Sequence, residues 1–156
     1  MSGNTLSLKS RAKLLSCHPE LQRVVNYAEA WMPFPFLVQE GHRARARQMR
    51  LFERGRALQE GRWLITQPEM VATHYDGQER LSKYNIDPSQ AVTLAPDPAY
   101  PCDRDRYHVM AGVVLAAAAY LRIPVRWGSE WSDALQDEPE PAIERLGHFQ
   151  LNRPTF

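Results

Sequence analysis

The side chains of this sequence that could do chemistry include a dense run of arginines. Sixteen of the nineteen basic residues are Arg, and seven of these fall between Arg43 and Arg62. A guanidinium group is a planar fork that matches carboxylates and phosphates, so this stretch predicts an anion-binding surface. The alternative interpretation is the solvated face of a helix, and the sequence alone leaves both open.

The cysteines and several histidines give weaker signals. The two cysteines, Cys17 and Cys102, are far apart and form no C-x-x-C pair, so no disulfide framework is expected and a reducing compartment fits. A metal site of Cys102 with His108 is not favoured, because the spacing matches none of the usual zinc signatures. We interpret His18, His42 and His108 as structural or surface histidines.

A chain of 156 residues must position these groups, and this length predicts a single domain, 1–156. Apolar spacing predicts helices over 7–15, 19–31, 43–58 and 106–121, and short strands over 36–39, 91–94, 124–127 and 148–151. The 59–90 segment lacks periodicity and is expected to be an extended excursion with one short helix near 69–73, and the 132–141 segment a solvated acidic loop. Helices followed by a small sheet with an inserted helix predict an α+β fold.

Composition excludes some classes of protein. A formal net charge of +1 argues against a uniformly basic nucleic-acid-binding protein. The longest apolar run, 109–121, is too short to span a bilayer and is predicted to be a buried helix. The N-terminus has no apolar signal-peptide core. We therefore expect synthesis in the cytoplasm, no membrane insertion and no nucleic-acid partner.

Four segments, in this order, resemble the phage L-alanyl-D-glutamate peptidases. These are zinc endolysins of the D-Ala-D-Ala carboxypeptidase-like (peptidase M15) superfamily, and they cut the stem peptide of peptidoglycan. The matching segments are 18–24, 38–43 (followed by Gln48, Leu51 and Gly55), 121–131 and 147–151. The resemblance covers most of the chain. It implies an M15 peptidase-like fold of the Hedgehog and DD-peptidase type, with N-terminal helices on a small, mainly antiparallel sheet and a buried helix.

The resemblance also implies which positions correspond to the family's zinc site. The family motif Ser-x-His-x-x-Gly-x-Ala-x-Asp supplies two ligands, and here Tyr84 and Thr93 stand at those positions. His148 matches the third ligand. Arg145 stands where the family has its catalytic carboxylate, with Glu144 next to it.

These substitutions predict a site that has lost its zinc and its catalysis. A catalytic zinc needs three ligands from His, Cys, Asp or Glu, and neutral phenol and hydroxyl groups are poor substitutes. Arg145 would place a positive charge beside a dication and cannot accept a proton. We therefore expect no zinc or other cofactor and no enzymatic activity, which is the definition of a pseudoenzyme. The alternative is a rearranged metal site built from His74, His148 and Asp76 or Glu144.

The same positions could still form a binding surface. Strand alternation places His148 and Gln150 on one face of the last strand, opposite Phe149 and Leu151. Arg43 has two interpretations, either binding the carboxylate of a peptide or pairing with Glu40. The predicted binding residues are Arg43, Gln48, Arg145, His148 and Gln150.

These expectations give a ranked set of functions. The first is an inactive peptidase-like domain, reused as a structural or binding component of a bacteriophage virion, in the tail or head–tail region. It would be present in several copies, with other virion proteins as its partners. The alternatives are a peptidoglycan-binding module and a still-active cell-wall endopeptidase with an unusual metal site. Nucleic-acid binding through the arginine run ranks last.

Overall fold

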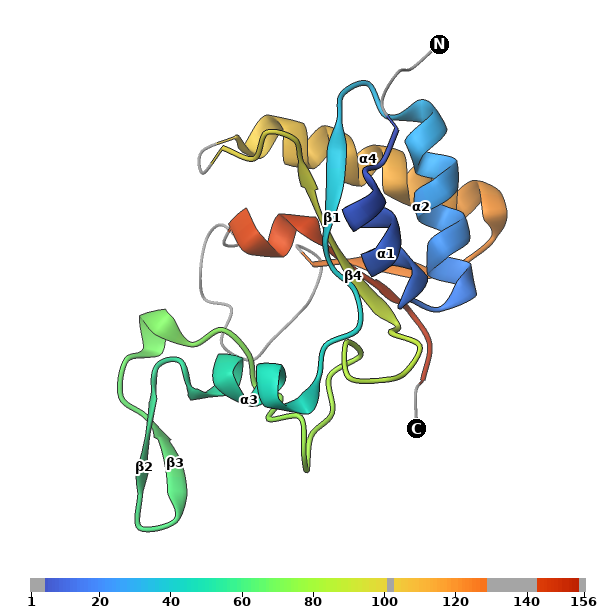
Figure 1. Cartoon of the computed structure of the whole chain (residues 1–156). Coiled ribbons are helices and arrows are strands. Elements are labelled where there is room, and N and C mark those ends of the chain that lie inside the picture. The colour runs from blue at the N-terminus through green and yellow to red at the C-terminus, as the bar shows by residue number, and fades with distance from the viewer. Residues whose placement is uncertain (1–4, 101–102, 129–142, 155–156) are drawn as a thin grey trace.

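The protein combines helices with two antiparallel sheets, and a computed structural model describes it over residues 5–100, 103–128 and 143–154 (Figure 1). In chain order the elements are α1 Leu8–Leu15, α2 Pro19–Trp31, β1 Phe36–Glu40, α3 Arg45–Glu53, β2 Arg56–Gln59, β3 Arg62–Ile65, η1 Pro68–Met70, β4 Ala91–Pro96, α4 Arg104–Leu121, β5 Val125–Trp127, η3 Ile143–Gly147 and β6 His148–Leu151. The predicted α+β fold is confirmed. Among the helices of the described residues, none is long and apolar enough to cross a membrane.

The first two helices begin where capping side chains allow them to. The Ser7 hydroxyl accepts the N–H of Ser10 and starts α1. The His18 ring accepts the N–H of Glu20, and Pro19 occupies the first position of α2, where its missing N–H costs nothing. Both helices therefore lie where the sequence predicts them.

The main sheet has the strand order β1-β4-β6-β5, and each neighbouring pair is antiparallel. Strand β4 is its buried centre. Val92 and Leu94 of β4 join Phe149 and Leu151 of β6 in the hydrophobic core. His148 and Gln150 alternate with these apolar residues and are half-buried, as predicted for the last strand.

Helix α4 also contributes to the core, together with α1 and α2. Met110, Val114 and Ala117 are fully buried in it, which confirms the predicted buried helix. Helix α2 packs beside α4, and the ring of Tyr27 stacks on that of Tyr120 with 5.1 Å between centroids. The helix ends at Leu121.

The residue that closes α4 has an unusual backbone. Arg122 takes the left-handed conformation with φ of 58°, and its N–H donates to the carbonyls of Ala118 and Ala119. This is the geometry in which helices most often use glycine.

A hairpin replaces the second half of the predicted 43–58 helix. Helix α3 ends at Glu53, and Arg56–Gln59 already forms the first strand of the β2–β3 hairpin. The chain reverses at Glu60 and Gly61, whose φ values of 51° and 76° match a type I′ turn. Figure 1 shows the hairpin extending away from the main sheet. The predicted helix was therefore too long, and its continuation is extended.

The rest of the 59–90 segment returns to β4 largely through loops. The short helix predicted near 69–73 is η1, at Pro68–Met70. Beyond it, the Asp76 carboxylate accepts the N–H groups of Gln78, at 2.8 Å, and Arg80, at 3.0 Å, which closes a tight turn. The acidic loop predicted over 132–141 lies outside the described residues.

Candidate functional site

Three polar side chains form a row across the face of the sheet that is turned away from the core. Glu40 of β1 is the register partner of Thr93 in β4, and Thr93 is the register partner of His148 in β6. Opposed residues on neighbouring strands point to the same face of a sheet. Thr93 and His148 were predicted to line one surface, and the register places them opposite each other on neighbouring strands.

A β-bulge brings Glu40 into this row. The register between β1 and β4 passes from Val38 opposite Leu94 directly to Glu40 opposite Thr93, so Gln39 is the extra residue. Without the bulge Gln39 would stand opposite Thr93, and Glu40 would turn toward the core, because side chains alternate along a strand. Glu40 is the member of the site that sequence reasoning missed, since periodicity alone cannot locate a bulge.

Tyr84 lies over this row from the loop before β4. Its hydroxyl and the Thr93 hydroxyl are 2.6 Å apart and hydrogen-bonded. Its ring meets the His148 ring edge-on, with 5.8 Å between centroids. Tyr84 and Thr93 are both buried, and burial raises the pKa of the Tyr84 phenol far above its ordinary value. Both groups are therefore neutral hydroxyls in the folded protein.

Arg43 is buried beside Tyr84 and is held by several partners. Its guanidinium forms a bidentate pair with Glu40, with nitrogen–oxygen distances of 2.9 and 2.7 Å, and donates to the Gln48 side-chain oxygen at 2.9 Å. Its charge also lies 4.0 Å from the centre of the Tyr84 ring. Of the two interpretations of Arg43, the pairing with Glu40 is therefore the one present in the structure.

Gln48 connects this cluster to the loop before β4. It projects from α3, is fully buried, and its amide nitrogen donates to the Tyr75 carbonyl at 2.8 Å and to the Thr73 hydroxyl at 3.3 Å. Gln48 was predicted as a binding residue. The structure shows it joining α3, Arg43 and the 73–75 segment, which is a positioning role.

The charge state of the row follows from burial and from Arg43. Burial, then the charges of Arg43 and Arg145, lower the pKa of His148 from 6.5 to about 4, against an opposing effect of Glu40. Burial raises the pKa of Glu40, but the hydrogen bonds and charge of Arg43, with Arg47 and His148, outweigh it and hold this pKa below its ordinary value. At neutral pH the row therefore carries an ionised carboxylate and an uncharged imidazole.

The remaining predicted residues lie around the row. Gln150 follows on the same face of β6, opposite Ala91 of β4 and Arg126 of β5. Arg145 lies in η3, close enough for its charge to lower the pKa of His148, as expected for neighbours. The cluster thus brings together Tyr84, Thr93, Arg43, Gln48, Arg145 and His148, with Gln150 at its border.

Two of the three positions that the resemblance assigns to zinc ligands hold residues that do not fit zinc. Tyr84 and Thr93 are neutral, buried and hydrogen-bonded to each other, and a guanidinium lies against the Tyr84 ring. Within the described residues no group of three His, Cys, Asp or Glu side chains could hold a metal ion. The absence of bound zinc stays a prediction.

The rearranged metal site predicted as an alternative is not assembled in the described part of the chain. The His74 ring lies 3.3 Å from the Arg56 guanidinium, and the Asp76 carboxylate is used by backbone N–H groups of its own turn. The Glu144 side chain and Cys102 lie outside what the structure describes.

Comparison with known proteins places this site in a recognised fold. No family model and no curated protein sequence matches the chain. Among solved structures, the chain is similar to the L-Ala D-Glu endopeptidase ChiX of Serratia marcescens, at 25% sequence identity and a TM-score of 0.65. The match covers 96% of this chain and 91% of that one. The fold is peptidase-like.

This finding corrects one prediction. The chain was expected to be a pseudoenzyme, but its peptidase-like fold is shared over nearly its whole length with an endopeptidase. The prediction rested on Tyr84, Thr93 and Arg145 at three matched positions. Substitutions at matched positions do not exclude catalytic groups supplied from elsewhere in the chain, so they were too narrow a basis for that conclusion.

Proposed function

We propose that this chain recognises the peptide of bacterial peptidoglycan through the row of Glu40, Thr93 and His148. The observation that carries the proposal is the row itself, on the outer face of the sheet in a fold shared with an L-Ala D-Glu endopeptidase. Glu40 and His148 are half-buried, so both keep a part that a ligand can reach. A peptide offers N–H donors and carboxylates, and these complement an ionised carboxylate and a neutral imidazole.

The buried groups make this row rigid. Arg43 fixes the Glu40 carboxylate through two hydrogen bonds, and Tyr84 fixes the Thr93 hydroxyl through one. Rigid polar groups lose little entropy when a ligand binds, so fixed geometry favours recognition. Arg47, which is 44% exposed and lies 3.7 Å from Glu40, adds a cation at the edge of the row.

Sedimentation with insoluble peptidoglycan tests the proposal. We expect the purified chain to sediment with the polymer and His148→Ala to weaken this binding about tenfold, the effect of losing one well-placed hydrogen bond. His108→Ala is the matched control, because His108 is exposed on α4 and lies outside the row. Equal sedimentation of wild type and His148→Ala, or none for wild type, contradicts the proposal.

Hydrolysis of the same peptide is the second candidate, and the similarity to an endopeptidase favours it. Mass spectrometry of digested peptidoglycan detects it as new peptide ends, and metal analysis of the purified chain shows whether zinc accompanies it. New ends that disappear in His148→Ala support hydrolysis. Binding without new ends limits the chain to recognition.

The virion setting is a proposal that rests on the resemblance to phage peptidases. It places the chain in the tail or head–tail region, in several copies, with other virion proteins as partners. Proteomics of purified phage particles tests it, because a structural component is recovered with the particle at fixed stoichiometry and a lysis protein is not.

A further inference from the structure

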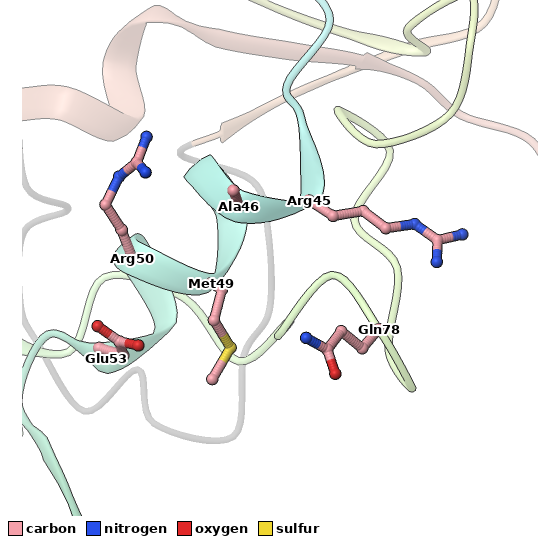
Figure 2. A pocket seen from close by; sticks show the side chains of 6 residues that line it. All are labelled: Arg45, Ala46, Met49, Arg50, Glu53 and Gln78. Carbon is pink, nitrogen blue, oxygen red and sulfur yellow. The ribbon is translucent and has the colours of Figure 1, made fainter.

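An open hollow of about 540 Å³ lies along the outer side of α3 (Figure 2). This volume is within the range typical of small-ligand sites, about 300–1,000 Å³. Within the described residues, the lining comes from α3 and one loop residue, and consists of Arg45, Ala46, Met49, Arg50, Glu53 and Gln78. Figure 2 shows Met49 between Arg45 and Gln78 on one side and Arg50 and Glu53 on the other.

The arginines between Arg43 and Arg62 differ in what they contact. Arg43 and Arg47 lie against Glu40, and Arg56 donates to the backbone carbonyls of Phe52 and Thr73. Arg45 and Arg50, in contrast, are exposed and have no ion-pair partner among the described residues. The run thus contains three arginines with structural contacts and two that line the hollow, while Arg54 and Arg62 are exposed outside it.

The charge of the hollow favours an anion. Two guanidinium groups face one carboxylate, that of Glu53, so the lining carries a net positive charge at neutral pH. Arg45 and Arg50 project in different directions on either side of the Met49 side chain, which contributes apolar atoms to the lining. A short peptide with two free carboxylates matches two separate guanidinium groups, because each arginine fork binds one carboxylate bidentately.

Packing contacts and hydrogen bonds link the hollow to the row on the sheet. Gln78 follows Gly77, which is buried with φ of +82°, and a Cβ at Gly77 would lie 2.9 Å from the Cβ of Gln48. Gln48 in turn accepts from Arg43, the partner of Glu40. The turn that lines the hollow therefore packs directly on the residue that supports the row.

We propose that this hollow is a second subsite, in which Arg45 and Arg50 each bind one free carboxylate of the same cell-wall peptide. The proposal rests on the proposed function and extends it from recognition by the row to a defined acidic contact. It assigns two exposed members of the arginine run, Arg45 and Arg50, to ligand binding.

Methyl NMR of the methionines tests the subsite directly. The probe is the dipeptide L-Ala-D-Glu, and the control ligand is the same dipeptide with both carboxylates amidated. We expect the Met49 methyl resonance, assigned with Met49→Leu, to shift saturably with the acidic dipeptide and not with its diamide. Met32 and Met110 are buried in the core, and their resonances should stay in place.

Charge-matched variants supply the second arm. We expect R45Q/R50Q to raise the titration midpoint about tenfold or more, because two charge-assisted contacts are lost. R54Q/R62Q removes the same charge from exposed positions outside the hollow and should leave the midpoint unchanged. All four side chains are exposed, so folding is checked by an unchanged unfolding midpoint.

The outcomes separate the two proposals. The subsite is overturned when the Met49 resonance does not shift with the dipeptide, or when R45Q/R50Q and wild type have the same titration midpoint. Either result overturns it even when the chain sediments with peptidoglycan. A wild-type chain that does not sediment contradicts the proposed function, whatever Met49 reports. An equal loss in both double variants shows general charge attraction and also overturns the subsite.

Discussion

Within the described residues, the Thr93 hydroxyl has one hydrogen-bond partner, the Tyr84 hydroxyl. A substitution that removes either hydroxyl therefore leaves the other without this partner. Both hydroxyls are buried, and they lie 2.6 Å apart. A buried polar group that loses its partner keeps the full cost of its lost hydration. The two hydroxyls therefore stabilise the protein only when both are present.

Replacing Tyr84 by Phe removes one hydroxyl and leaves the other unsatisfied. We expect Tyr84→Phe to lower the free energy of unfolding by about 1–3 kcal/mol. Urea denaturation measures this change, and Tyr75→Phe, at a 44% exposed ring, is the control with little expected effect. The double variant Tyr84→Phe/Thr93→Val should recover much of the loss, because both partners are then apolar; a further loss would contradict the pairing.

His148 gives the protein a specific pH dependence. Its pKa is lowered in the folded state, first by burial, from 6.5 to about 4. The unfolded chain therefore takes up this proton first, so the folded state is fully favoured above about pH 6.5 and loses this stability as the pH falls toward 4.

The size of this effect can be measured against a variant without the imidazole. From pH 7 to pH 5 we expect the free energy of unfolding to fall by about 2 kcal/mol more in wild type than in His148→Asn. Taking the difference cancels the contributions of Glu40 and of the other histidines. Parallel pH profiles for the two proteins would show that His148 titrates normally.

The sequence predicted some residues of the site and not others, for physical reasons. Period-2 alternation fixed the face of His148 and Thr93, because both belong to regular strands. Glu40 was placed as a partner of Arg43 but not as part of the row, since its orientation depends on the bulge at Gln39. Side-chain hydrogen bonds such as that of Tyr84 to Thr93 require tertiary contacts that no local pattern contains.

At the scale of elements, the hairpin after α3 shows where local signals were misleading. The apolar spacing of Met49 and Phe52 predicted a helix over 43–58, with Gly55 as a residue that favours an earlier end. The helix ends at Glu53, two residues before Gly55, whereas the turn at Glu60–Gly61 was missed because glutamate is not a usual residue of a type I′ turn. The capped helices α1 and α2, with clear start signals, were predicted well.

The turn at Gly77 is the element on which the two proposed binding regions converge. A Cβ at this position would approach the side chain of Gln48 to 2.9 Å, in a left-handed backbone. We expect Gly77→Ala to destabilise the protein by about 1–3 kcal/mol, through the strained φ and the displaced Gln48. Thermal unfolding measures the total loss of stability.

A variant at Gly61 distinguishes the cost of the strained backbone from the cost of displacing Gln48. Its φ of +76° is similar, but a Cβ there meets nothing within 4 Å. Gly61→Ala should therefore show the backbone cost alone, about 1 kcal/mol. Equal losses in the two variants would mean that the contact with Gln48 has no energetic weight.

The whole molecule divides into a well-packed body and an extended hairpin. Strand β4 is buried along its entire length, whereas β2 and β3 have no buried residue. Two-stranded hairpins are marginal on their own in water, because they bury little apolar surface. The Phe52 and Trp63 rings, 6.2 Å apart, join the hairpin to α3.

We expect this difference to appear in hydrogen exchange. Amides of β2 and β3 should exchange through local opening, at least about tenfold faster than those of β4, which exchange through global unfolding. Mass spectrometry of deuterated peptides measures both regions in one sample. Equal protection would show that the hairpin is as firmly held as the main sheet.

At this scale the fold was predicted better than the activity. The order of elements and the buried helix α4 followed from apolar periodicity, and the similarity to an endopeptidase confirmed the peptidase-like fold. The inactivity inferred from Tyr84, Thr93 and Arg145 was contradicted by the same comparison. Substitutions at three positions describe a local environment, while activity depends on every group that the fold brings together.

One substitution at the end of α4, that of Arg122 by glycine, should stabilise the protein. Arg122 holds a left-handed conformation that costs a side-chain-bearing residue about 1 kcal/mol, and glycine adopts it freely. Arg122→Gly should therefore raise the unfolding midpoint in a thermal scan. The added stability would let the chain tolerate more destabilising mutations elsewhere. Laboratory evolution of its binding surfaces should therefore begin from Arg122→Gly.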